Sequence, residues 1–149
     1  TINDELSNLN LTISLFSKSD QMNTDTDILL IDSYGETSKF YNISKCVLLG
    51  KSLIKSSTNN GGHNPVEPSR FGCKVFHGPN VSNFAEIYKY LKSLGVADQV
   101  STPEELNQSL VEEFKEDKAN NNQVIEKIDN YGLNILNNVI KEIKIYINT

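Results

Sequence analysis

The sequence has little of several residue types that would point to particular classes of protein. It contains no tryptophan, two cysteines, two histidines and four prolines in 149 residues. Cys46 and Cys73 lie in separate apolar runs and belong to no CxxC or Cys/His cluster, which predicts free buried thiols and argues against a disulfide or a zinc site. The sequence also lacks a GxxxxGK[ST] loop and a Ser/His/Asp set in a supporting motif. It therefore predicts no catalytic residue, no metal and no cofactor.

An excess of positive charge and long apolar runs are also absent. Lysine and arginine total 14 against 19 acidic residues, for a formal net charge of −5. This balance argues against a nucleic-acid surface, although a local basic pocket could still hold a phosphate. The apolar runs are far shorter than the about 20 residues that a membrane-spanning helix needs, and the N-terminus lacks a signal-peptide pattern. We expect no nucleic-acid partner and no membrane insertion by this chain.

What the sequence does have is an alternation of short apolar runs with amphipathic segments, which is typical of a parallel α/β fold. Strands are expected at residues 11–16, 28–31, 46–49, 73–76 and 99–101. Helices are expected at residues 2–9, 36–43, 65–71, 83–94, 102–114 and 122–147. We predict a single Rossmann-like domain over residues 1–149, with a parallel sheet of about five strands and helices on both faces.

One loop, Gly61 to Pro68, has the character of a phosphate-binding loop before a helix. Its sequence is GGHNPVEP, with Pro65 at the expected first helical position and Glu67 in the first turn. Backbone N–H groups and the positive end of a helix dipole suit a phosphate at such a place. An ordinary capped helix after a flexible loop would have the same pattern.

Four glycine-bearing loops lie beyond the carboxyl ends of the predicted strands, at residues 32–36, 50–55, 61–67 and 78–83. Because the carboxyl ends of parallel strands meet at one edge of a sheet, we expect these loops to converge there. A nucleotide site in this fold requires such convergence. The sequence therefore predicts a phosphorylated ligand.

Two histidines and two acidic residues lie in or beside these loops. His63 and His77 can act as acid or base, or can donate hydrogen bonds to a ligand or to the backbone. Glu36 and Glu67 can pair for acid–base work, stand as acids in the first turn of a helix, or accept the hydroxyls of a ribose. The residues alone leave these alternatives open.

Three motifs make the sequence recognisable: DSYGE at 32–36, GGHNPVEPSRFG at 61–72 and GPNVSNFAEI at 78–87. In this order and spacing they resemble the C-terminal half of the 3-deoxy-D-manno-octulosonic acid (Kdo) transferases, two-domain glycosyltransferases of the GT-B architecture that take Kdo from CMP-Kdo. The resemblance covers about residues 11–114. It departs from the family pattern at Tyr34, where methionine is common, and at Lys51, where a second glycine is common.

The resemblance implies roles for individual residues. It places a set of residues in contact with the CMP moiety of the donor: Tyr34, Gly35, Glu36, Gly61, Gly62, His63, Asn64, Pro65, Val66 and Glu67. Among these, the two adjacent glycines and His63 would shape the phosphate loop. Asn80 and Asn83 are candidates for contact with the donor sugar, with helix capping as the alternative.

The resemblance also implies an activity. The parent enzyme would transfer Kdo from CMP-Kdo to a lipid A precursor, with inversion and without metal, in lipopolysaccharide synthesis at the cytoplasmic side of the bacterial inner membrane. The family's N-terminal domain, which carries the acceptor site and the catalytic base, has no counterpart here, so this chain alone is expected to be inactive. Alternatives are the donor domain of another GT-B enzyme that uses a UDP-sugar, a non-catalytic interaction domain, and a free-standing nucleotide-binding regulator.

Overall fold

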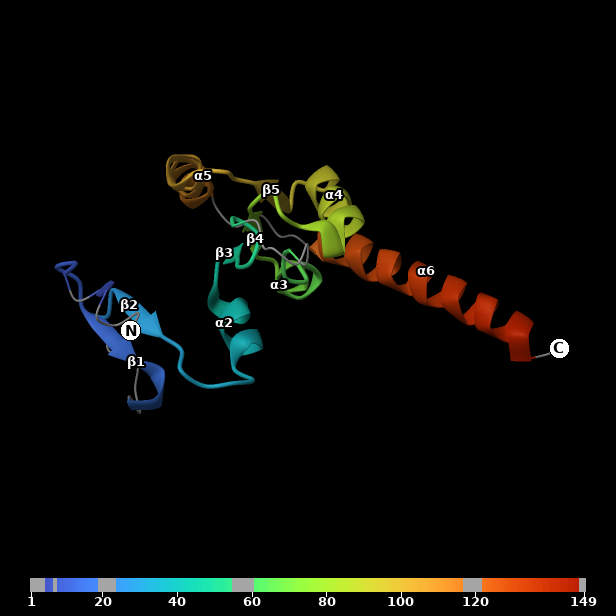
Figure 1. Cartoon of the computed structure of the whole chain (residues 1–149), viewed down its shortest axis with the longest axis horizontal. Coiled ribbons are helices and arrows are strands. Elements are labelled where there is room, and N and C mark those ends of the chain that lie inside the picture. Colours follow the sequence, from blue (N-terminus) through green and yellow to red (C-terminus); the bar gives the residue numbers. More distant parts are fainter. Residues whose placement is uncertain (1–4, 7, 19–23, 55–60, 117–121, 148–149) are drawn as a thin grey trace. The chain divides into compact units, whose positions relative to one another are not determined.

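The computed structural model describes residues 5–6, 8–18, 24–54, 61–116 and 122–147. It divides into two compact units, Thr1–Thr37 and Ser38–Thr149, which are described separately. Figure 1 labels their elements along the chain. The first unit contains strands β1 (Ile13–Leu15) and β2 (Ile28–Leu30) and the short 3-10 helix η1 (Phe16–Lys18). Helix α2 (Thr37–Ile43) begins at the boundary between the units.

In the first unit, β1 and β2 form a two-stranded parallel sheet in which Ile13 pairs with Ile28 and Leu15 with Leu30. Acidic side chains accept backbone hydrogen bonds at both ends of this pair of strands. The Thr12 N–H donates to the Asp27 carboxylate at 2.8 Å, and the Ser17 N–H donates to Asp32 Oδ1 at 3.0 Å. These side-chain bonds supplement the few backbone bonds that two three-residue strands can make.

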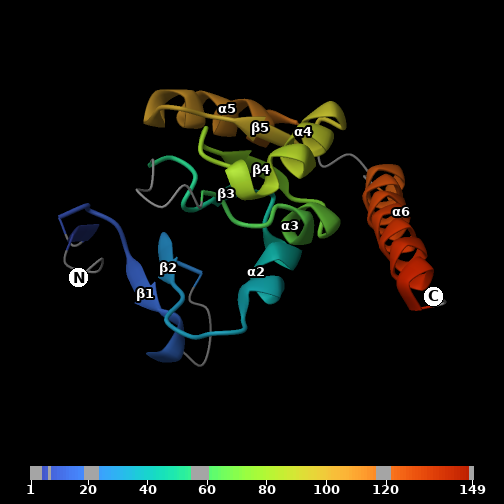
Figure 2. The same cartoon turned by 45° about the vertical axis from the view of Figure 1, so that its right-hand side comes forward.

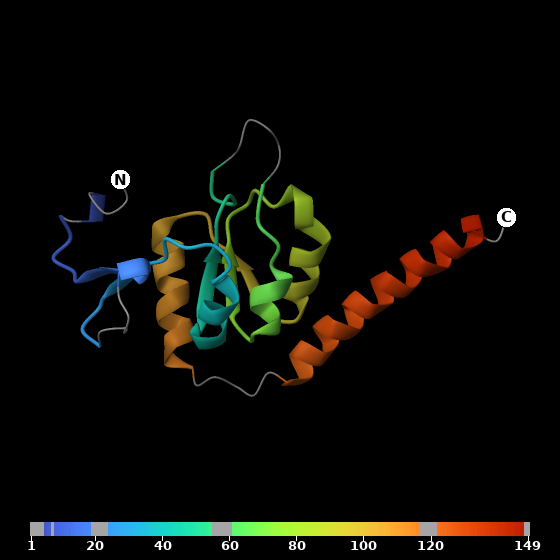
Figure 3. The ribbon, with the colours of Figure 1, turned by 90° about the horizontal axis from the view of Figure 1, so that it is seen from below.

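The second unit contains a three-stranded parallel sheet in the order β3-β4-β5. Its strands are β3 (Cys46–Leu49), β4 (Lys74–His77) and β5 (Ala97–Gln99). Its other elements, in chain order, are α3 (Val66–Arg70), η2 (Ser82–Phe84), α4 (Ala85–Ser93), α5 (Pro103–Lys115) and α6 (Asn122–Ile147). Figure 2 and Figure 3 show the strands of this unit with α4 and α5 beside them.

The core of the second unit forms around β4, the central strand. Val75 and Phe76 of this strand are essentially fully buried. Helix α4 adds Tyr88 and Leu91, and α6 adds Ile128. Each large apolar side chain removed from water in this way stabilises the fold by about 1.5–3 kcal/mol.

The ends of the longer helices follow the sequence signals. Helix α5 begins at Pro103, and the Glu105 N–H donates to Oγ1 of the N-cap Thr102 at 3.2 Å, as a capping threonine followed by proline predicts. Helix α6 covers the predicted residues 122–147. Ile128 near its start is buried, whereas residues 132–147 are exposed, with apolar side chains such as Leu136, Ile140 and Ile143 among them.

The α/β class and the parallel pairing of strands are confirmed. The described strands form two sheets, one of two strands and one of three. Hydrophobic periodicity along a sequence locates a strand and its buried face, but it does not identify the strand that pairs with it. The prediction of a single domain over residues 1–149 stays a prediction.

Two further expectations concern cysteines and membranes. Cys46 and Cys73 are both free, as predicted; Cys73 is buried, with its thiol donating to the Tyr41 carbonyl at 3.2 Å, whereas Cys46 is only partly buried. Burial raises the pKa of the Cys46 thiol. Among the helices within the described ranges, none combines the length and the apolar character needed to cross a bilayer.

Candidate functional site

Three loops of the second unit are joined by hydrogen bonds at the carboxyl ends of β3 and β4, and Ser52 is their centre. Ser52 is fully buried. Its hydroxyl donates to the Leu49 carbonyl at 2.6 Å and accepts the Gly78 N–H at 2.8 Å. Its own carbonyl accepts the Asn80 N–H at 2.9 Å and the Asn80 side-chain amide at 3.1 Å. One small side chain thus connects the loop after β3 to the loop after β4.

The same loops approach one another more closely than any side chain would allow. A Cβ added at Gly78 would lie 2.2 Å from the Ser52 carbonyl oxygen, and one added at Gly61 would lie 2.4 Å from the Asn80 oxygen. Only glycine fits at both places. Gly62 then donates its N–H to the Lys51 carbonyl at 2.9 Å. The predicted convergence is therefore confirmed for the loops near residues 50, 61 and 78, while that of the loop at 32–36, in the other unit, stays a prediction.

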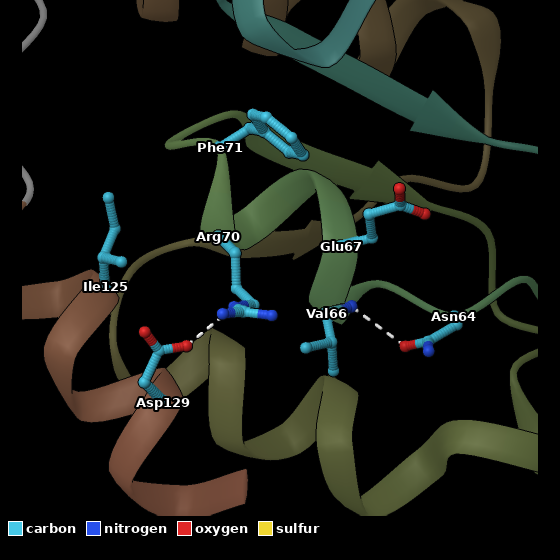
Figure 4. A pocket seen from close by; sticks show the side chains of 7 residues that line it. All are labelled: Asn64, Val66, Glu67, Arg70, Phe71, Ile125 and Asp129. Atoms are coloured by element: carbon cyan, nitrogen blue, oxygen red, sulfur yellow. Dashed lines mark hydrogen bonds and ion pairs between the residues drawn. The ribbon is translucent and has the colours of Figure 1, made fainter. Parts of the chain in front are cut away.

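The start of α3 differs slightly from the prediction. The helix begins at Val66, so Pro65 is its N-cap residue and not its first helical residue. The Val66 N–H donates to Asn64 Oδ1 at 3.0 Å (Figure 4). Because α3 has only five residues, its dipole is small, and the case for an anion depends on loop N–H groups instead. The N–H groups of His63 and Asn64 form no hydrogen bond within the described part of the chain.

A hydrogen bond from helix α4 positions the candidate phosphate loop. The Tyr88 hydroxyl donates to the His63 carbonyl at 2.9 Å. Burial raises the pKa of Tyr88 to about 12, so the hydroxyl remains a donor at physiological pH. The His63 ring itself is exposed and lies beside Gly50, whose added Cβ would be 3.8 Å from His63 Cδ2. His63 is thus placed where it can meet a ligand.

His77, the other histidine, has a structural role. It is 4% exposed, its ring packs on Tyr88 with centroids 4.1 Å apart, and its Nδ1–H donates to the Gly78 carbonyl at 2.7 Å. Burial lowers the pKa of His77, which favours the neutral ring. The structure thus shows the other alternative for this residue, a hydrogen bond to the backbone.

Glu67 lies on the exposed side of α3 beside a hollow of about 450 Å³. Its Oε1 accepts a hydrogen bond from the Ser38 hydroxyl at 2.9 Å. Figure 4 shows the residues that line the hollow: Asn64, Val66, Glu67, Arg70, Phe71, Ile125 and Asp129. Arg70 and Asp129 form an ion pair of 2.7 Å across it, from α3 to α6. The volume falls in the range of about 300–1,000 Å³ that is usual for small-ligand sites.

The two asparagines do not cap α4. The N-cap residue of that helix is Phe84, with no side-chain cap, and Asn83 is an exposed residue of η2. The Asn80 side-chain amide donates to the carbonyls of Ser52 and Leu53, at 3.1 and 3.3 Å. The capping alternative is wrong for both residues, because Asn80 connects loops and Asn83 lies outside the cap position.

Sequence reasoning missed two residues that shape this site, Ser52 and Tyr88. Ser52 belongs to no motif, and a buried serine after a strand carries no signal of its own. Tyr88 appears in the sequence as one more apolar position on the buried face of α4. Its hydroxyl is the only hint that a polar partner has to lie nearby.

Comparison with known proteins places this site in context. No protein-family model matches the sequence. The 3-deoxy-D-manno-octulosonic acid transferase of Haemophilus influenzae is 35% identical over 115 residues, which cover 76% of this chain and 25% of that protein. The enzyme of the same name from Aquifex aeolicus is 29% identical over 90 residues, which cover 60% of this chain and 24% of the relative. This chain is a relative of the Kdo transferases.

The fold agrees with that relationship. The crystal structure of the C-terminal CMP-Kdo binding domain of WaaA from Acinetobacter baumannii matches with a TM-score of 0.68 and 21% identity, covering 91% of this chain and 66% of that one. The resemblance to Kdo transferases that the motifs carry is confirmed by these sequence matches. The chain spans about a quarter of the length of the Kdo transferases that it matches.

The groups that the Kdo transferase motifs bring together suit binding more than bond cleavage. They are loop N–H groups, the Asn64 amide, the His63 ring and the Glu67 carboxylate. Among the residues that the structure describes, no cluster of three or more His, Cys, Asp and Glu side chains could hold a metal ion. N–H groups bind phosphate oxygens and a carboxylate binds sugar hydroxyls, so the arrangement is suited to a nucleotide.

Proposed function

We propose that this chain binds the CMP part of CMP-Kdo and is the donor-binding portion of an enzyme that transfers Kdo to a lipid A precursor. The observation that carries the proposal is the joining of the loops around Ser52, Gly61 and Gly78 at the carboxyl ends of β3 and β4. Loops in this place form the ligand site of open α/β sheets. The sequence relationship to Kdo transferases then favours a cytidine nucleotide as the ligand.

The phosphate and the ribose of the nucleotide each have a candidate partner. The N–H groups of His63 and Asn64 would donate to the phosphate, where each bond to a charged acceptor contributes about 1.5–3 kcal/mol. The Glu67 carboxylate would accept the ribose hydroxyls, with its position set by Ser38. As the bond between Kdo and CMP breaks, negative charge grows on the leaving phosphate, and donors already in place stabilise it. These residues can support this step without moving a proton.

Further parts of the proposal rest on the motifs alone. Tyr34, Gly35 and Glu36 are proposed as additional CMP contacts, and the fully exposed Tyr34 side chain is open to a ligand. Asn83 remains a candidate for contact with the donor sugar. Both units are proposed to belong to one donor-binding domain. The acceptor site and catalytic base would lie on a part of the enzyme outside this sequence, and the whole enzyme would act at the cytoplasmic face of the bacterial inner membrane.

Titration of the ¹⁵N-labelled chain with CMP, followed by NMR, tests the ligand. We expect amide shifts at Gly61, Gly62, His63 and Asn64, with affinity in the millimolar range because only part of a cleft is present. UMP is the comparison ligand, since a UDP-sugar enzyme would favour the uridine nucleotide. Absent shifts in this loop at millimolar CMP would contradict the proposal, and stronger binding of UMP would favour the UDP-sugar alternative.

Substitution of Glu67 tests the ribose contact. Glu67→Gln removes the negative charge but keeps the shape, and we expect CMP affinity to fall about three- to tenfold, since a hydrogen bond to a charged group is weakened. Glu104→Gln is the matched control, because Glu104 is also the second residue of its helix and is exposed. An interaction domain with no nucleotide ligand predicts instead that Glu67→Ala changes the melting temperature and that wild type and variant bind CMP equally poorly.

A further inference from the structure

Lys51 has a backbone conformation that its side chain does not favour. Its φ is +57°, and it is the one non-glycine residue with positive φ in the described ranges. A left-handed backbone is unfavourable for residues with a Cβ, and glycine adopts it freely. Hence a glycine would serve the turn between Gly50 and Ser52 better than a lysine does. Strain of this kind is found most often at functional sites.

Lys51 is also directly joined to the candidate phosphate loop. Its carbonyl accepts the Gly62 N–H at 2.9 Å, so its backbone lies next to the residue that precedes His63. The lysine is exposed, and its ammonium group forms no ion pair or hydrogen bond with a described residue. The charge is therefore available to a ligand held by the loop.

The loops otherwise have little positive charge. In residues 50–54, 61–65 and 78–81, Lys51 is the one lysine or arginine, in a chain of net charge −5. The short helix α3 supplies only a small dipole. Backbone N–H groups can orient a phosphate, but a phosphate also gains affinity from a nearby cation. Lys55, in the same loop, lies outside the described residues, so among the described residues of these loops Lys51 is the source of permanent positive charge.

We propose that Lys51 binds the phosphate of the nucleotide and that its left-handed backbone is retained for this contact. The inference rests on the proposed nucleotide function and adds a residue to it. Because the Lys51 backbone contacts Gly62, its flexible side chain can bring a point charge to a phosphate held by the neighbouring N–H groups, and an ammonium group beside a phosphate needs no fixed geometry. The ligand class is a nucleotide with a charged phosphate, and the contact selects against the neutral nucleoside.

Substitutions at Lys51 separate charge from strain. Lys51→Gly and Lys51→Asn both remove the charge, and both new residues tolerate positive φ. We expect the dissociation constant for CMP to rise about three- to tenfold in both variants, as for loss of one exposed ion pair. Binding of cytidine, which has no phosphate, should not change. Lys51→Gly should also raise the melting temperature by about 3 °C because strain is relieved.

Two further variants serve as controls. Lys51→Arg keeps the charge and should keep CMP affinity within about twofold of wild type. Lys89→Asn removes an exposed charge from α4 and should leave CMP affinity unchanged. Equal CMP affinity in wild type, Lys51→Gly and Lys51→Asn would overturn the inference while leaving the nucleotide function intact. An equal loss of CMP and cytidine affinity would also overturn it, and failure of the wild type to bind CMP would overturn the nucleotide function itself.

Discussion

At the scale of single residues, the candidate site depends on polar side chains that form hydrogen bonds within the protein. Ser52 and Asn80 form hydrogen bonds with the backbone of the loops, and the Tyr88 hydroxyl donates to the His63 carbonyl. These contacts leave His63, Asn64 and Glu67 exposed at the surface. The buried residues thus position the loops, and the exposed residues are the ones that a ligand would touch.

The buried histidine gives the protein a predictable response to pH. Burial lowers the pKa of His77 below its usual 6.5; the Gly78 hydrogen bond and Asp98 oppose this shift and Lys92 adds to it. The unfolded chain therefore takes up the proton first, and stability falls as pH drops through 6.5 and below. Urea unfolding between pH 5 and 8 should show this loss in wild type and in His63→Asn. A loss that persists in His77→Asn would contradict the assignment.

At the scale of elements, the loops after β3 and β4 depend on backbone contact that only glycine permits. Gly78→Ala would place a methyl group 2.2 Å from the Ser52 oxygen, so the two loops would have to separate. We expect a loss of about 2–4 kcal/mol in the free energy of unfolding, as for other overpacked and strained sites. CMP binding should weaken with it, because the phosphate loop loses its neighbour.

Gly132→Ala is the matched comparison for this substitution. Gly132 lies inside α6, and a Cβ there would meet nothing within 4 Å. Alanine is about 1 kcal/mol better than glycine in a helix interior, so this variant should be more stable than wild type. Chemical denaturation of both variants measures the contrast. Equal effects at Gly78 and Gly132 would show that the loops of the site are not in close contact.

The elements also show why some predictions succeeded. The limits of β3 and α6 and the Thr102 cap follow from patterns of neighbouring residues, and such patterns are local. The one-residue difference at Pro65 and the absent cap at Asn83 concern element ends, where local signals compete. The number of sheets and the burial of His77 depend on segments far away in the chain, which a local pattern does not contain.

At the scale of the whole molecule, the sequence motifs predicted more than the composition did. Composition and periodicity predict an α/β fold with converging loops, and the structure agrees for the second unit. The order of the motifs DSYGE, GGHNPVEP and GPNVSNF predicts a similarity to the Kdo transferases, and the sequence and fold comparisons agree with that prediction. Neither route identifies Ser52 or Tyr88, because their roles appear only when the loops and α4 are placed together.

The contact between Gly61, Gly78 and their neighbours has a consequence for how such a site can change during evolution. Since these loops are held by backbone atoms and by the side chains of Ser52, Asn80 and Tyr88, the side chains at positions 51 and 63 contribute little to holding them. Those positions are free to vary with the ligand while the frame beneath them persists. In a deep mutational scan, substitutions at these glycines should be rejected under selection for folding alone. Substitutions at their exposed neighbours, only a few positions away, should be rejected only under selection for nucleotide binding.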